Sequence, residues 1–178
     1  MKSNIKKSFY PLILMAILLL TMPAYAKSEK IDKAFSVNKG GKLVVECDLG
    51  SIYVGTYDGD EVFVSVKKRA SSQEQLENFG VQIEQRGNDI YVKGENGQDN
   101  MVGVEFTVDV PREYNVDLRT GEGYISVADI KGNVDAYTSE GNIKVSDVGG
   151  DLKADAPKGS VHSGKITGKS SVHNRTEI

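Results

Sequence analysis

Hydrophobic and polar residues alternate along most of the chain after residue 40, in short runs separated by Gly, Asn and Asp. The clearest run extends from Val102 to Val110, with Val or Phe at every second position after Val102 until Pro111 ends it. Alternation with a period of two places successive side chains on opposite faces of a strand, whereas a helix needs apolar residues three or four apart. The pattern therefore predicts an all-β protein.

The same alternation predicts further strands at residues 43–47, 51–54, 62–66, 81–84 and 90–92. The last two flank Arg86-Gly-Asn-Asp89, a typical hairpin turn sequence. One helical turn is predicted over residues 71–79, because Ser71 and Glu74 match a capping box.

From Val116 onward the pattern repeats every 18 residues, and residues 18 apart are called a column below. The glycine columns are Gly123, Gly141 and Gly159, and Gly132, Gly150 and Gly168; the apolar columns are Ile125, Ile143 and Val161; Ile130, Val148 and Ile166; and Val116, Val134 and Leu152. A short fixed period is typical of solenoids, in which each repeat covers the hydrophobic face of the one before it. We therefore expect a single-domain, β-helix-like β-solenoid with 18-residue rungs, in which the apolar columns are buried neighbours.

A degenerate copy of the repeat precedes the others. Gly50-Ser-Ile-Tyr-Val54 matches Gly123-Tyr-Ile-Ser-Val127, and Val62 is expected to take the place that Val134 has in the repeats. Residues 163–178 are predicted to form the end rung, because Ser163 and Ser170 replace apolar residues in inward positions.

Charged residues also follow the period of 18. Four acid–base pairs have this separation: Asp135 and Lys153, Glu140 and Lys158, Asp147 and Lys165, and Asp151 and Lys169. One rung earlier the columns are acid over acid: Asp117 and Asp135, Glu122 and Glu140, and Asp129 and Asp147. Opposite charges on neighbouring strands stabilise a sheet by roughly 0.2–1 kcal/mol per pair. We expect the four pairs to set the register of the second and third rungs.

The N-terminus has the features of a secretory signal. Lys2, Lys6 and Lys7 precede the apolar run of residues 12–20, and Ala24-Tyr-Ala26 is a small-x-small cleavage site. The run is shorter than the roughly 20 residues that a membrane-spanning helix needs. We expect residues 1–26 to be a cleavable signal peptide and residues 27–178 to be one exported domain, periplasmic or secreted and soluble after cleavage.

The mature chain is acidic. Three of the 22 basic residues lie before residue 27, which leaves 19 against 25 acidic ones. This balance, without a basic run, argues against nucleic acid or an anionic membrane as partner. Cys47 is the single cysteine and alternates in phase with Leu43 and Val45, which predicts a buried thiol and no intramolecular disulfide.

The spacing Gly-x-Ile-x-Val-x-x-Ile-x-Gly-x-Val resembles the bacterial "putative adhesin" families, which are exported β-strand-repeat domains of unknown function. The resemblance covers nearly all of the mature chain and includes residues 43–54, Asp58-Gly-Asp-Glu-Val62 and Val108-Asp-Val-Pro111. It implies a β-solenoid-like domain on an exported bacterial protein, and it brings no catalytic motif with it.

Candidate catalytic and metal-binding residues are sparse. His162 and His173 lie in different columns, and Asp58-Gly-Asp-Glu61 lacks the further ligands of a calcium loop. No Gly-x-Ser-x-Gly nucleophile motif occurs. We therefore expect no metal, no cofactor and no catalytic activity.

Two functions remain open at this point. The first is a structural or binding module of the cell envelope that contacts a protein or glycan, with self-association through the end rung as a further possibility. The second is a small extracytoplasmic glycan-binding or glycan-processing protein. Tyr124 and Tyr137 are the outward-facing aromatic candidates for ligand contact.

Overall fold

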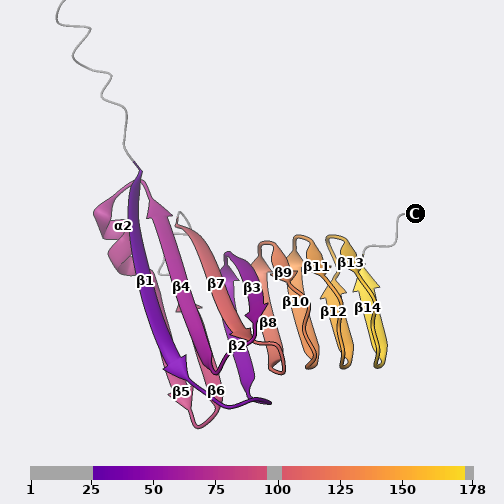
Figure 1. Ribbon diagram of the computed structural model, residues 1–178. Coiled ribbons are helices and arrows are strands. Elements are labelled where there is room, and N and C mark those ends of the chain that lie inside the picture. The colour runs from indigo at the N-terminus through magenta and orange to yellow at the C-terminus, as the bar shows by residue number, and fades with distance from the viewer. Residues whose placement is uncertain (1–25, 96–101, 175–178) are drawn as a thin grey trace, which may run out of the picture.

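The computed structural model describes residues 26–95 and 102–174, and its strands form two mixed seven-stranded sheets (Figure 1). Sheet A has the order β1 (Lys27–Ser36), β4 (Glu61–Ala70), β7 (Gly103–Pro111), β3 (Ser51–Tyr57), β9 (Ile125–Val127), β11 (Ile143–Val145) and β13 (Val161–Ser163). Sheet B has the order β14 (Ser170–Asn174), β12 (Leu152–Ala156), β10 (Val134–Glu140), β8 (Asn115–Glu122), β2 (Lys42–Leu49), β6 (Asp89–Glu95) and β5 (Gly80–Arg86). The all-β prediction is confirmed. The signal-peptide prediction falls on residues 1–25, outside the described part of the chain.

The C-terminal repeats pair in parallel with an offset of 18 residues. In sheet B, Val134 pairs with Val116 on one side and with Leu152 on the other. In sheet A, Ile143 pairs in the same way with Ile125 and Val161. Figure 1 shows the result as a ladder of short strands from β8 to β14.

The degenerate first copy joins the same ladder. Strand β2 pairs in parallel with β8, which places Leu43 beside Val116, and β3 pairs with β9, which places Ile52 beside Ile125. Leu43, Ile52 and Ile125 are fully buried between the sheets. Complete burial of such a side chain contributes about 1.5–3 kcal/mol, so each buried position of the apolar columns stabilises the fold.

Glycine is required where the chain turns between the two sheets. Gly123 and Gly141 have φ angles of +152° and +140°, which L side chains rarely adopt. A Cβ on Gly141 would also overlap the carbonyl oxygen of Gly123 in the preceding rung. The glycine column is therefore a consequence of how closely successive backbones approach at this corner.

Two buried threonines support the same corner. The Thr120 hydroxyl donates to the carbonyl of Gly50 at 2.9 Å, and the Thr138 hydroxyl donates to that of Gly123 at 3.1 Å. Cys47 pairs with Thr120 and is buried as predicted, and burial raises the pKa of its thiol. Removal from water disfavours the thiolate, so Cys47 packs as a small apolar residue.

The N-terminal half departs from the repeated rung. Val62 does not take the position of Val134: it lies in β4, which runs antiparallel to β1 and β7, and it pairs with Phe35. The turn at residues 58–60 sends the chain back within sheet A instead of across to sheet B. The predicted hairpin is confirmed as β5 and β6. Strand β1 was not predicted, because only Ile31 and Phe35 of its ten residues pack against the core.

The predicted helical turn is present as α2 (Gln73–Asn78), with its capping box one residue later than expected. Ser72 accepts a hydrogen bond from the Gln75 N–H at 3.2 Å, and the Gln75 side chain accepts from Ser72. At the other end of α2, the buried Lys68 ammonium donates to the Leu76 carbonyl at 2.9 Å. It also pairs with Glu29 of β1 at 2.9 Å, so one lysine of β4 fastens both α2 and β1.

Replacing Gly141 by Ala is expected to destabilise the protein strongly. Backbone strain of this kind costs on the order of 1–3 kcal/mol, and the overlap with Gly123 adds to it. Gly80→Ala is the matched control, because Gly80 has an ordinary φ and its Cβ would meet atoms only at 4.0 Å. Urea unfolding should show a large loss of free energy for Gly141→Ala and almost none for Gly80→Ala. Equal stability of the two variants would contradict the close approach at the corner.

Tyr114 should lower the stability of the protein at alkaline pH. Its side chain is fully buried and its hydroxyl donates to the Asn88 carbonyl; burial, together with the nearby Asp89, raises its pKa to about 12. An unfolded tyrosine titrates near pH 10, so the unfolded chain loses this proton first as the pH rises. Stability should be constant below about pH 10 and fall between about pH 10 and 12.

The absorbance of tyrosinate near 295 nm measures this titration directly. Burial also raises the pKa of Tyr57, and Tyr114 should be the last tyrosine to ionise. Tyr114→Phe should remove this last step and reduce the associated fall in stability. A last step near pH 12 that is unchanged in Tyr114→Phe would assign it to another tyrosine.

Candidate functional site

A groove of about 740 Å³ crosses the outer surface of sheet B at the beginnings of β2, β8, β10, β12 and β14. Its volume lies within the range of about 300–1,000 Å³ that is usual for ligand sites. Asn115, Asn133, Ser170 and Ser171 contribute polar groups to its lining. The charged residues of the lining are Lys42, Asp117, Asp135, Asp151, Lys153 and Lys169.

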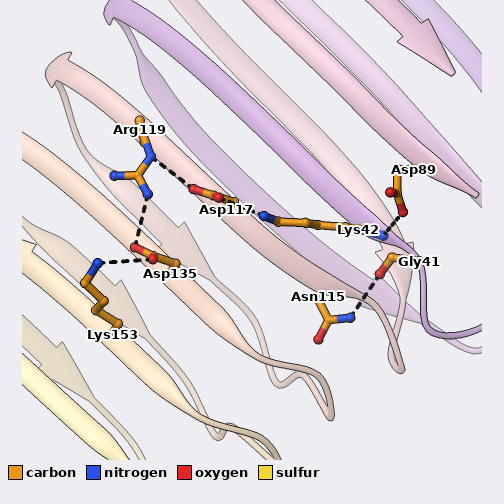
Figure 2. A network of polar contacts seen from close by, with 8 residues as sticks. All are labelled: Gly41, Lys42, Asp89, Asn115, Asp117, Arg119, Asp135 and Lys153. Carbon is orange, nitrogen blue, oxygen red and sulfur yellow. Dashed lines mark hydrogen bonds and ion pairs between the residues drawn. The ribbon is translucent and has the colours of Figure 1, made fainter. Parts of the chain in front are cut away.

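Five charged side chains follow one another across β2, β8, β10 and β12 on this surface (Figure 2). The Lys42 ammonium lies 2.8 Å from the Asp117 carboxylate, and Arg119 Nε lies 3.1 Å from the same carboxylate. Arg119 Nη2 then lies 3.6 Å from Asp135, whose other oxygen lies 3.4 Å from Lys153 Nζ. We call these five residues the ion-pair network. The hydrogen bond to Asp117 raises the pKa of Lys42, which keeps this end of the network charged.

Of the four predicted acid–base pairs, two form ion pairs. Lys153 contacts Asp135, and Lys158 contacts Glu140. In the other two pairs the aspartate accepts a hydrogen bond from the backbone N–H of the lysine: Asp147 from Lys165 at 2.8 Å, and Asp151 from Lys169 at 2.7 Å. All four pairs therefore lie in the register of 18, but a backbone donor replaces the ammonium in two of them.

The column of Asp117 and Asp135 is acid over acid, as the sequence indicates, but the two carboxylates are compensated. Arg119 lies two residues after Asp117 on the same face of β8 and contacts both. Lys42 comes from β2, 75 residues away in the sequence. Alternation along β8 could have indicated Arg119, whereas only the pairing of β2 with β8 brings Lys42 to the site.

A second ladder of side chains lies at the beginnings of the same strands. The side chain of Asn115 accepts from the Asn133 N–H at 3.0 Å, and that of Asn133 accepts from the Asp151 N–H at 2.8 Å. Asp151 continues the series to Lys169. The Asn115 side chain also donates to the Gly41 carbonyl at 3.3 Å, and Asp89 accepts from the Lys42 N–H at 2.9 Å (Figure 2). The edge of the groove is thus held by hydrogen bonds between successive rungs.

The two predicted ligand-binding tyrosines lie on different sheets and do not form one site. Tyr124 precedes β9 and contacts Tyr53 of sheet A, with ring centroids 6.0 Å apart. Tyr137 lies in β10 of sheet B, with its hydroxyl 3.1 Å from that of Ser139. Tyr53 was missed as a candidate, although its alternation with the buried Ile52 and Val54 marks it as outward-facing.

The end of the ladder is more exposed than the inner rungs. Ile125, Ile143, Ile130 and Val148 are buried, whereas Val161 and Ile166 of the same columns are only partly buried. Val172 of β14 pairs with the buried Ala154 but is 44% exposed. The predicted end rung of residues 163–178 thus has an open face in its described part, and residues 175–178 lie outside that part.

The other candidate reactive groups remain apart. His162 and His173 are exposed, on β13 of sheet A and β14 of sheet B. Over residues 26–95 and 102–174, no three His, Cys, Asp or Glu side chains are grouped as metal ligands would be. Within the same ranges, no helix is long and apolar enough to cross a membrane.

No protein-family model matches the chain, and no curated protein matches its sequence. Among solved structures, it is similar to a putative cell adhesion protein from Clostridium sporogenes, with 12% identity and a TM-score of 0.46 over 85% of this chain and 100% of that one. A putative adhesin from Parabacteroides distasonis has 14% identity and a TM-score of 0.41 over 81% of this chain and 70% of that one. A putative lipid binding protein from the same organism has 9% identity and a TM-score of 0.27 over 83% and 97%. Similarity of this degree assigns neither a family nor a function to the chain.

The Lys42–Asp117 pair is expected to stabilise the protein measurably. Asp117 has only 18% of its side chain exposed, so a double-mutant cycle with Lys42→Met and Asp117→Asn should give a coupling of about 0.5–1 kcal/mol that decreases with salt. The control cycle uses Lys30→Met and Asp32→Asn, whose side chains are 61% and 59% exposed. It should give a clearly smaller coupling. The prediction fails if the two cycles give equal values.

Proposed function

We propose that this protein is an exported, non-catalytic binding module of the bacterial cell envelope. In this proposal residues 1–26 are a signal peptide, and the mature domain of residues 27–178 carries a β-solenoid of 18-residue rungs. The parallel pairing of residues 18 apart in both sheets supports the solenoid, and the charged n-region, short apolar run and cleavage sequence support export. The product would be periplasmic or secreted.

The ion-pair network is the observation that best supports the proposed binding role. Its carboxylates and cations contact one another, so each side chain is already held in place before a partner arrives. A surface that is ordered in advance loses little conformational entropy on binding, which favours specific contact. The partner we propose is a protein or glycan of the envelope with a matching arrangement of charges or hydroxyl groups.

The absence of catalysis is part of the proposal and has a separate basis. A catalytic base or nucleophile must reach the substrate with a suitable pKa. Cys47 is buried and its pKa is raised, and the two histidines lie on different sheets. The carboxylates of the ion-pair network are paired with Lys42, Arg119 and Lys153. These groups fit recognition better than proton transfer.

Self-association through the end rung is the second mode of contact that we propose. Among the described residues, strand β14 is the edge strand of sheet B at the end of the repeats, and its sequence Ser-Ser-Val-His-Asn carries no Lys, Glu or Pro. Such residues are what proteins commonly use to keep an edge strand from pairing with another chain.

Sedimentation with envelopes of the producing bacterium tests the proposed function. Purified protein from Lys27 onward should sediment with the envelopes, and a Lys153→Glu/Lys169→Glu variant should lose most of this binding because both lysines line the groove. Lys67→Glu/Lys144→Glu is the matched control, since both lysines lie on strands of sheet A, away from the groove. It should bind like the unmodified protein.

Three results would contradict the proposal. They are absence of sedimentation, equal loss of binding in both variants, and release of soluble sugar or peptide from the envelopes by the protein.

A further inference from the structure

Two pairs of aromatic rings lie on the outer surface of sheet A, away from the groove. Tyr53 contacts Tyr124, and Tyr57 contacts Phe63 of β4 with ring centroids 5.8 Å apart. Tyr53 and Tyr57 share the outward face of β3 because they alternate with the buried Ile52 and Val54. Phe63 is 42% exposed and, with Val172, is one of the two exposed large hydrophobic residues among the described residues.

A hollow of about 430 Å³ lies beside Phe63. The strand register places Phe63 between Ala34 of β1 and Asp109 of β7. It places Ser65, two residues further along β4, between Asp32 and Thr107. The hollow therefore has one aromatic wall, a small side chain at Ala34, and two hydroxyl groups and two carboxylates around it.

The rim of the hollow favours a ligand that donates hydrogen bonds over a ligand with a negative charge. The hydrogen bonds from Lys30 and Ser65 lower the pKa of Asp32, so this carboxylate stays ionised near neutral pH. Among the described residues, Asp109 has no ion-pair partner, and its carboxylate lies across Gly55, where a Cβ would collide with it. Lys33 also lines the hollow, but its ammonium lies 3.5 Å from the Ile83 carbonyl of sheet B.

We infer that this hollow binds one sugar unit of a linear glycan that is neutral or carries amino groups. A pyranose ring presents an apolar C–H face, which matches Phe63, and a rim of hydroxyl groups, which Asp32, Asp109, Ser65 and Thr107 can accept or donate to. Carboxylate acceptors form stronger hydrogen bonds than neutral ones. Asp32 is paired with Lys30, but Asp109 has no ion-pair partner among the described residues, so its charge disfavours uronate or phosphate groups beside Phe63.

The second aromatic pair, Tyr53 and Tyr124, indicates the path along which a longer glycan would extend from the hollow. Strand β3 lies two strands from β4 in sheet A, which is about 10 Å at the usual strand spacing. A linear glycan in the hollow can therefore continue over Thr107 toward Tyr53 and Tyr124, which lie on the same surface. This site is on the other sheet from the groove, so it goes beyond the proposed function and can fail independently of it.

The test is a titration of ¹⁵N-labelled protein, from Lys27 onward, with three hexasaccharides: cellohexaose, a chitosan hexamer and an oligogalacturonate. Amide shifts should centre on β1, β4 and β7 with the first two, and the chitosan hexamer should bind more tightly. The oligogalacturonate should cause little change. Phe63→Ala should raise the Kd for cellohexaose at least about tenfold. Asp109→Asn should remove most of the preference for the chitosan hexamer.

Val172→Ala is the matched control, because Val172 is the other large exposed hydrophobic residue of the described chain and lies on β14. It should bind cellohexaose like the unmodified protein. If Phe63→Ala fails to fold, Phe63→Leu, which keeps the bulk without the ring, takes its place. The inference is overturned if neither cellohexaose nor the chitosan hexamer shifts these strands, if the oligogalacturonate binds equally well, or if loss of the ring leaves binding unchanged.

Discussion

Parallel pairing between residues 18 apart is the constraint on which the rest of this structure depends. Once successive rungs lie one strand spacing apart, each residue has its own equivalent directly above and below it. Each residue of a column must therefore fit against the equivalent residue of the neighbouring rung. Apolar columns satisfy this by packing between the sheets, and the corner column satisfies it with glycine, because any Cβ there would meet the backbone of the preceding rung.

Polar columns meet the same constraint in two ways. Where acid and base alternate, as at Asp135 and Lys153, the side chains pair directly. Where acid lies over acid, a cation from the neighbouring position joins the two carboxylates, as Arg119 does for Asp117 and Asp135. The ion-pair network of sheet B is therefore a product of the stacking, and it extends in order across four strands.

The outer surfaces of the two sheets differ in regularity. Around the groove, sheet B consists of parallel strands in the register of the repeats. Sheet A includes β1 and β4, which run antiparallel and end the regular columns. Their outward residues are free of the period of 18. Phe63, Ala34 and Asp32 of these strands surround a hollow together with Asp109 of β7. In this region Lys68 joins β4 to α2 through the Leu76 carbonyl and to β1 through Glu29.

The sequence alone determined the all-β class, the register of the C-terminal repeats and the burial of the inner columns, because a strict period leaves a single pairing that matches every column. It also indicated the first copy and the hairpin, whose signals are local. The direction of β4, the presence of β1 and the position of Lys42 beside Asp117 were decided by the tertiary structure. These contacts join segments far apart in the chain that have no shared period, so their energies arise only when the sheets assemble. For the same reason, the contact of Tyr124 with Tyr53 could not be predicted from the sequence. The fold decides on which sheet each tyrosine lies, and it places Tyr137 on the other sheet.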